Sequence, residues 1–195
     1  MLKIGITGGI GSGKTTVCRI FELLGTPVYY ADEVSRELFA SDPEIKSAIL
    51  TLFGEGVLDE DNSLSRKKIA ERVFGDEEQL KKLNSIIHPA VAKHFDRWLM
   101  QHSTFPYIIK EAAIMFESGA YLQMDKIITV TAPVDQRIAR VMKRDRTSAE
   151  DIQRRMNAQL PEEERIKRSQ FIIVNDEQKM VIPQVIELHQ KFLTE

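Results

Sequence analysis

Five short apolar runs recur along the chain, and turn residues or polar clusters bound each of them. They cover residues 3–7, 27–32, 107–116, 126–132 and 171–175. Between these runs the apolar positions recur at helical spacing, so strands alternate with helices. This alternation predicts an α/β fold of three layers, in which helices cover both faces of a five-stranded parallel sheet. Ligands of such folds bind at the carboxyl ends of the strands.

Two intervals between the runs are too long for a simple crossover. The first contains four helical patterns, at residues 42–54, 64–75, 76–87 and 89–102. Turns at Gly54, Gly56 and Gly75 lie between the first three patterns, and the succession of helical patterns indicates a helical insertion rather than further strands. We therefore predict one domain, 1–195, whose core comprises 1–32, 105–134 and 171–195, with a helical insertion at 33–104 and a second helical segment at 135–170.

The bulk composition narrows the classes of protein that remain. A chain of 195 residues can bury about 70% of its unfolded surface around one core. With 27 basic and 29 acidic residues the net charge is −2, so nothing indicates a nucleic acid or an anionic membrane as partner. The lone cysteine, Cys18, excludes an internal disulfide, and no apolar run is long enough to span a bilayer. We expect a cytoplasmic protein, either a monomer or a weak homo-oligomer.

The first apolar run leads directly into a glycine-rich loop, in the stretch KIGITGGIGSGKTT at residues 3–16. Gly8, four further residues and then Gly13-Lys14-Thr15 match the phosphate-binding pattern between a strand and a helix. Glycines leave the backbone amides accessible, and the helix start offers unpaired N–H groups to an anion. Lys14 then places a charge at the outer phosphates, and the Thr15 hydroxyl is the expected Mg²⁺ ligand.

A tight turn alone would need only one or two glycines, so this pattern strongly favours a nucleoside triphosphate as ligand. The predicted nucleotide contacts are Gly9, Ile10, Gly11, Ser12, Gly13, Lys14, Thr15 and Thr16. The pattern does not indicate what happens to the phosphate.

Residues 135–170 hold ten of the 27 Lys and Arg residues, where an even spread would give about five. Arg137, Arg140 and Arg144 fall on one helical face, and apolar positions including Met142 lie on an adjoining face that could dock it. The alternative is a solvated helix with intermixed acids. A bound triphosphate favours a lid, whose arginines stabilise the charge of phosphoryl transfer and exclude water. A lid indicates a transferase rather than a hydrolase.

Asp32 follows the second strand, at the sheet edge that the phosphate loop shares. Its carboxylate could accept a proton from an attacking hydroxyl or help to hold magnesium. Equally, it could be the N-cap of a helix at 33–40. Arg36, one helical turn further, could meet an anionic acceptor or pair with Glu33 or Glu37.

Several motifs, in this order, resemble those of the dephospho-CoA kinase family, which has a P-loop fold like that of nucleoside-monophosphate kinases. They are IGITGGIGSGKTT at 4–16, YAD at 30–32, LNSIIHP at 83–89, AAIMFESG at 112–119, and QRIARVMKRD with RRMNAQ at 136–145 and 154–159. The first is shared by many nucleotide-binding proteins, whereas the combination is far more specific. Tyr30, Glu111 and Ala113 depart from the family pattern.

The resemblance implies transfer of the ATP γ-phosphate to the ribose 3′-hydroxyl of dephospho-CoA, with Mg²⁺ as cofactor. It implies that residues 33–104 hold the acceptor and that residues 135–170 close over ATP. It also implies roles for single residues: Asp32 as the base, Arg140 and Arg144 as lid arginines, Asn84, His88 and Glu117 at the acceptor, and Asn175 beside the adenine. His88, which precedes Pro89, could instead end a helix.

Two other functions remain open from the sequence. A kinase for a nucleoside or a nucleotide would share the loop and the lid, but it would not need the LNSIIHP motif. A P-loop switch would bind or hydrolyse nucleotide without a small acceptor. No guanine-reading Asn-Lys-x-Asp motif supports the switch, and VNDE at 174–177 does not supply one.

Overall fold

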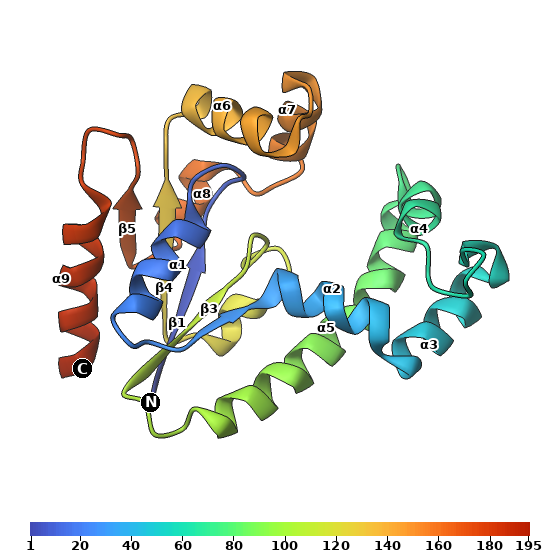
Figure 1. The fold of residues 1–195 in the computed structure, drawn as a ribbon, viewed down its shortest axis with the longest axis horizontal. Helices are drawn as coiled ribbons and strands as arrows, with labels where there is room; N and C mark the ends of the chain where they lie inside the picture. The colour runs from blue at the N-terminus through green and yellow to red at the C-terminus, as the bar shows by residue number, and fades with distance from the viewer. The chain divides into compact units, whose positions relative to one another are not determined.

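The computed structural model describes all 195 residues and contains a parallel sheet of five strands. The strands are β1 (Leu2–Thr7), β2 (Val28–Tyr30), β3 (Tyr107–Glu111), β4 (Lys126–Thr131) and β5 (Phe171–Val174). Their order across the sheet is β2-β3-β1-β4-β5 (Figure 1). The predicted α/β fold with five parallel strands is confirmed. Strand β1 pairs with β3 on one side and with β4 on the other, so the loop that follows β1 leaves the middle of the sheet.

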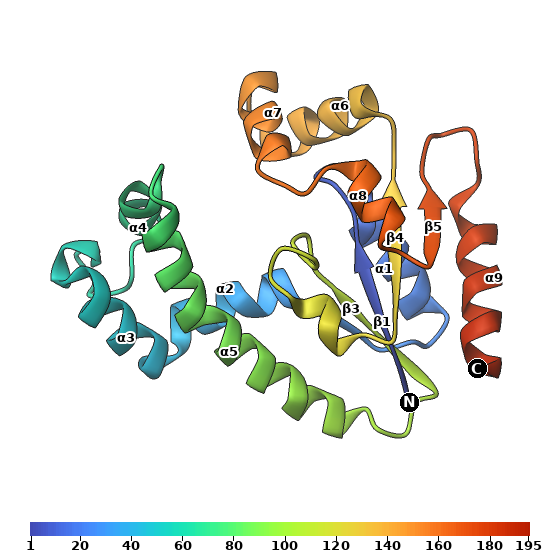
Figure 2. The ribbon, with the colours of Figure 1, turned by 180° about the vertical axis from the view of Figure 1, so that it is seen from behind.

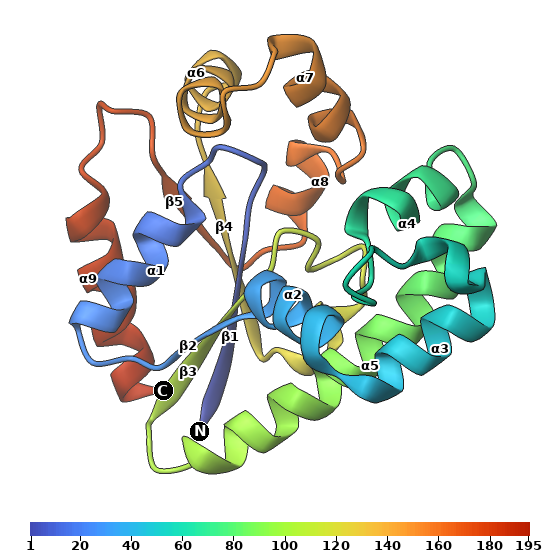
Figure 3. The ribbon, with the colours of Figure 1, turned by 45° about the vertical axis from the view of Figure 1, so that its right-hand side comes forward.

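Helices cover both faces of this sheet. The covering helices are accompanied by further helices, and the full set outside residues 31–101 is α1 (Lys14–Leu23), α6 (Val134–Asp145), α7 (Ala149–Asn157), α8 (Glu162–Lys167) and α9 (Val181–Thr194), with the short 3-10 helix η2 (Ala120–Gln123). Helices α1 and α9 lie together on one face, and α8 packs against β4 on the other (Figures 2 and 3). Helices α6 and α7 lie beyond the carboxyl ends of the strands (Figure 1).

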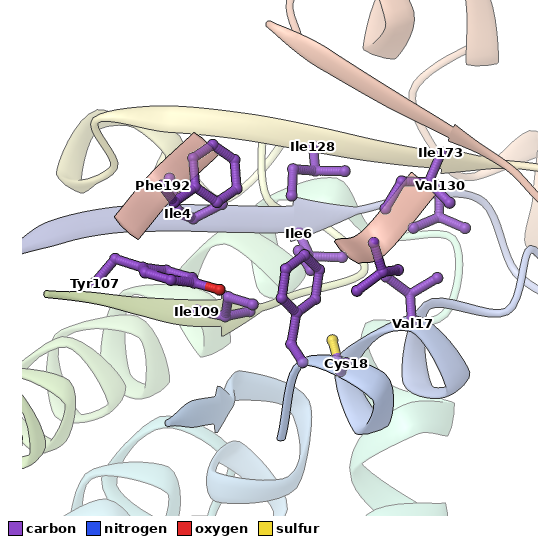
Figure 4. Close-up of a cluster of buried hydrophobic side chains, with 12 residues drawn as sticks. Ile4, Ile6, Val17, Cys18, Tyr107, Ile109, Ile128, Val130, Ile173 and Phe192 are labelled. Atoms are coloured by element: carbon purple, nitrogen blue, oxygen red, sulfur yellow. The ribbon is translucent and has the colours of Figure 1, made fainter. Parts of the chain in front are cut away.

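Apolar side chains of the three central strands fill the space beneath α1 and α9 (Figure 4). Ile6, Ile109 and Ile128 are fully buried there, and α1 contributes Val17. Cys18 is also fully buried in this cluster, and burial raises the pKa of its thiol. Cys18 therefore packs as a small core residue. This core fixes α1, and with it the helix N-terminus that follows the phosphate loop.

Residues Ala31–Gln101 form a second compact unit, while Met1–Tyr30 and His102–Glu195 form the first. The second unit contains α2 (Ala31–Ser41), α3 (Pro43–Phe53), the 3-10 helix η1 (Glu55–Val57), α4 (Arg66–Val73) and α5 (Glu77–Gln101). It has its own apolar core, which includes Phe39, Ile49 and Leu83. None of the helices in the chain is at once long and apolar enough to cross a membrane.

Helix α5 differs from the prediction, because it runs without a break through Pro89, where two helices were expected. Proline lacks the N–H that the carbonyl of Ser85 would accept, but Ser85 is exposed, so water can reach that carbonyl. Ile86 and Ala90, on either side of Pro89, pack against the same apolar cluster. Tertiary packing thus maintains the helix, and the reading of His88 as a helix end is wrong.

Candidate active site

The phosphate loop turns the chain from the end of β1 into the start of α1. Gly13, the residue before the helix, has φ 96°, a left-handed conformation that glycine adopts without strain. No side chain caps the first turn of α1, so its N–H groups are available to an anion. Thr15 and Thr16 are exposed in that turn. The loop therefore has the form that phosphate binding requires.

Lys14 points back into this loop. Its ammonium group donates a hydrogen bond to the carbonyl of Gly8 at 3.0 Å and lies 4.0 Å from a carboxylate oxygen of Glu111. Glu111 ends β3, the neighbour of β1, and is buried like Lys14. A cation and an anion thus lie side by side at the carboxyl edge of the sheet. The sequence showed Glu111 only as an acid within a strand, because the pairing that brings it to Lys14 is not local.

Arg137 of α6 clamps the loop from the other side. Its Nε donates to the carbonyl of Ile10 at 3.0 Å, and its Nη1 pairs with Glu162 at 2.6 Å. A Cβ atom on Gly9 would lie 2.0 Å from Nη2 of Arg137, so any other residue at position 9 would displace this guanidinium group. Arg137 was expected on a basic lid face, yet it is only 3% exposed. Arg137 therefore maintains the conformation of the loop.

Met142, which was expected to dock helix α6, is instead exposed.

Asn175, just after β5, reaches the same loop. Its side-chain amide donates to the carbonyl of Ser12 at 2.9 Å, and a Cβ atom on Gly13 would lie 2.2 Å from its Nδ2. Its backbone N–H donates to Thr131 at 2.8 Å, which fixes it to β4. The structure therefore brings Asn175 into direct contact with the predicted nucleotide loop.

Arg140 lies beside Asn175. Its Nη2 donates to the carbonyl of Asn175 at 3.1 Å and to Glu177 at 3.0 Å, while its Nη1 is buried without a hydrogen-bond partner. Arg140 and Asn175, predicted separately as nucleotide contacts, are therefore neighbours.

Gln159, in the linker between α7 and α8, occupies one amide of the phosphate loop. The N–H of Ile10 donates to its side-chain oxygen at 2.9 Å. A phosphate oxygen that approached this N–H would have to displace Gln159. Although Gln159 ends the RRMNAQ motif, nothing in the sequence indicated this contact, because it depends on how the linker folds back.

Arg144, at the end of α6, is bound to its neighbour Asp145. Nε and Nη2 of Arg144 donate to the two carboxylate oxygens at 2.6 and 3.0 Å, and Arg155 donates to Asp145 at 3.2 Å. Hydrogen bonds from Arg144 lower the pKa of Asp145 to about 2, so the pair stays charged near neutral pH. The side chain of Arg144 is 62% exposed.

Glu117 follows β3, and its carboxylate accepts a hydrogen bond from the backbone N–H of Leu160 at 2.8 Å. Leu160 is the residue after Gln159 in the linker. The predicted acceptor residue Glu117 therefore fastens the same linker that contacts the phosphate loop.

Asp32 and Arg36 lie in the first half of α2. The helix begins at Ala31, so Asp32 lies within its first turn, and the reading of Asp32 as the N-cap is wrong. The Arg36 Nε donates to the backbone carbonyl of Asp32 at 3.0 Å, and Arg66 donates to the carbonyl of Arg36 at 2.7 Å. The side chain of Arg36 therefore folds back along its own helix.

Asn84 and His88 are half-buried and lie one turn apart on α5, so they share a face of that helix. Burial lowers the pKa of His88, which keeps the imidazole neutral near pH 7. Asn84 and His88 of the LNSIIHP motif thus place two polar side chains next to each other on one face of α5.

An open hollow of about 510 Å³ lies between α3 and α5 of the second unit. Its lining includes Asp42, Ile45, Pro89, Lys93 and Arg97. Pro89, Lys93 and Arg97 recur at helical spacing on the face of α5 opposite Asn84 and His88. The predicted acceptor contacts are therefore not part of this hollow.

These features define a class. A parallel sheet, a glycine-rich loop that leads from the central strand into a helix, and arginines on the segment beyond the strands together define a P-loop kinase. The family model described as dephospho-CoA kinase matches residues 2–180. The chain belongs to the dephospho-CoA kinase family, and it is an ATP-dependent phosphotransferase.

Individual relatives agree with this assignment. A dephospho-CoA kinase from Bacteroides fragilis is 40% identical over 187 residues, which cover 96% of this chain and 91% of the relative. The crystal structure of a Thermus thermophilus protein has a TM-score of 0.85 at 31% identity and covers 99% of this chain and 96% of that one. A dephospho-CoA kinase from Campylobacter jejuni has a TM-score of 0.71 at 26% identity, with coverage of 98% and 97%.

Proposed function

We propose that this chain transfers the γ-phosphate of ATP to the ribose 3′-hydroxyl of dephospho-CoA, giving coenzyme A and ADP. This is the final step of coenzyme A biosynthesis. The family match over residues 2–180 supports the acceptor. The observation that carries the chemistry is the phosphate loop, where Lys14 and an uncapped helix start face one anion site.

On the nucleotide side, the amides of residues 9–16 bind the phosphates, and Lys14 leaves the carbonyl of Gly8 to pair with the outer ones. In this proposal Arg140 contacts these phosphates, which its hydrogen bond to Asn175, the residue that contacts Ser12, supports. Asn175 borders the adenine by its backbone. Arg144 joins the charged group when residues 135–170 close over ATP, which requires its ion pair with Asp145 to open.

Two oxygen donors fit Mg²⁺ at this site, the exposed hydroxyl of Thr15 and the carboxylate of Glu111. No group of three or more His, Cys, Asp or Glu residues gathers anywhere in the chain. That suits a cation bound mainly by phosphates and water, as Mg²⁺ usually is. When bound, Mg²⁺ neutralises charge on the β- and γ-phosphates.

On the acceptor side, Asp32 takes the proton of the attacking hydroxyl. Arg36, Asn84, His88 and Glu117 bind other parts of dephospho-CoA, and the second helical unit holds that substrate. Neutral His88 offers both a hydrogen-bond donor and an acceptor without bringing charge. In-line attack of the hydroxyl on the γ-phosphorus completes the transfer.

Mass spectrometry of the purified protein with ATP, Mg²⁺ and candidate acceptors tests this function. The acceptors are dephospho-CoA and a panel of nucleosides and their monophosphates. We expect one added phosphoryl group on dephospho-CoA alone. Phosphorylation of another acceptor with dephospho-CoA unchanged would refute the substrate, and turnover of ATP without any acceptor would favour a switch.

A further inference from the structure

Arg165 of α8 is a buried cation, two of whose guanidinium nitrogens lack hydrogen-bond partners. Its residue is 2% exposed, and neither Nε nor Nη1 has a hydrogen-bond partner. Burial, and after it the charge of Arg137, lower the pKa of Arg165, but a guanidinium remains protonated in proteins. Buried N–H groups without acceptors destabilise a protein, so such a group requires an explanation.

The acids around Arg165 are engaged elsewhere. Glu162, one turn earlier in α8, uses one carboxylate oxygen for Arg137 and the other for the hydroxyl of Thr131. Glu117 accepts from the backbone N–H of Leu160. These bonds leave the donors of Arg165 unsatisfied within the unliganded chain.

The position of Arg165 connects it to the phosphate loop. Residues three apart share a helix face, so Arg165 lies on the same side of α8 as Glu162. Glu162 holds Arg137, and Arg137 contacts both Gly9 and Ile10. The linker just before α8 supplies Gln159 to the same loop. Arg165 therefore lies on the helix face whose Glu162 is linked through Arg137 to the phosphate loop.

We propose that Arg165 binds a phosphate oxygen of a bound substrate, as a further binding residue for the transfer. This inference rests on the proposed function. A phosphate supplies the negative acceptor that Nε and Nη1 lack, and charge-assisted hydrogen bonds to guanidinium groups are strong. Two sources bring this chemistry to the site, the triphosphate of the nucleotide and the diphosphate of dephospho-CoA.

Arg165→Met removes the charge and keeps an apolar stem, and Lys167→Met, on an exposed residue of the same helix, is the matched control. Calorimetric titration with a non-hydrolysable ATP analogue and, separately, with dephospho-CoA distinguishes the two sources. We expect Arg165→Met to weaken one of these ligands by about tenfold or more, and Lys167→Met to weaken neither.

Thermal unfolding without ligand separates binding from a structural role. Removal of a buried, unsatisfied cation should leave the Tm of the unliganded protein unchanged or higher. The proposal would be overturned if Arg165→Met bound both ligands with the affinity of the native chain. It would also be overturned if the Tm of unliganded Arg165→Met were lower than that of the native chain by more than about 4 °C. The titration with the ATP analogue tests Arg165 even if dephospho-CoA proves not to be the acceptor, because it does not depend on the acceptor.

A measurement on the unmodified protein covers the case in which Arg165→Met does not fold. In ¹⁵N-arginine spectra, the Nε–H signal of Arg165, assigned by its loss in Arg165→Lys, should shift when the nucleotide analogue or dephospho-CoA is added. A signal that neither ligand moves would contradict the proposal.

Discussion

Three arginines on one helix face have different environments in this structure. The side chains of Arg137, Arg140 and Arg144 are 3%, 28% and 62% exposed. Arg137 forms part of the loop's scaffold, Arg140 borders the loop through Asn175, and Arg144 is bound only to its neighbour Asp145. The same type of side chain therefore supports the loop at one end of α6 and forms only an exposed ion pair at the other.

At Asp32, loss of the carboxylate charge should stop proton abstraction. We expect Asp32→Asn to lower kcat by about 10²-fold or more, with little change in the KM for ATP. Steady-state kinetics with dephospho-CoA measures this effect. Glu33→Gln, on an exposed acid in the same helical turn, is the control and should keep near-normal turnover. Near-normal turnover in Asp32→Asn would exclude its role as the base.

His88 predicts a pH dependence of stability. Burial lowers its pKa below 6.5 in the folded chain, so the unfolded chain binds the proton more readily. The contribution of His88 is therefore complete above pH 6.5 and is lost as the pH falls through the lowered folded pKa. His88→Gln should lose less unfolding free energy than the native chain between pH 7.5 and about 5.5 in urea titrations. Parallel pH profiles for the two proteins would be incompatible with this assignment.

At the scale of elements, we expect the linker between α7 and α8 to compete with a bound nucleotide. Gln159 occupies the Ile10 amide that a phosphate would use. Gln159→Ala removes this competitor, so we expect nucleotide to bind about two- to tenfold more tightly. Titration with a non-hydrolysable ATP analogue measures the change. Gln153→Ala, on a residue of α7 bonded only along its own helix, should leave affinity as it was. Weaker binding in Gln159→Ala would show that Gln159 supports the nucleotide instead.

Elements with strong local signals could be predicted from the sequence. The five strands follow from short apolar runs, and the phosphate loop follows from the spacing of Gly8, Gly13 and Lys14. The break expected at Pro89 was wrong, because packing of Ile86 and Ala90 holds the helix together. The contacts of Arg137 and Gln159 with the loop could not be predicted, since they join segments more than 120 residues apart.

At the scale of the whole molecule, nucleotide binding should stabilise the fold. A ligand at 100 times its Kd adds about 2.7 kcal/mol to the unfolding free energy, which raises the Tm of a chain of this size by about 5–10 °C. Lys14→Ala should abolish most of that shift for ATP, because the lysine binds the outer phosphates. Differential scanning calorimetry measures it, with the exposed Lys67→Ala as control. A full shift in Lys14→Ala would remove Lys14 from the nucleotide site.

The fastening of the phosphate loop has a consequence for the rate and the entropy of binding. Arg137, Asn175 and Gln159 hold the loop at Ile10 and Ser12 before any ligand arrives. The conformational entropy of the loop is therefore lost during folding rather than on nucleotide binding. The backbone of the loop is preorganised, and at the Ile10 amide the exchange of Gln159 for a phosphate oxygen separates the empty site from the filled one. The association rate of the nucleotide should then depend on how often the hydrogen bond between Gln159 and the Ile10 amide breaks.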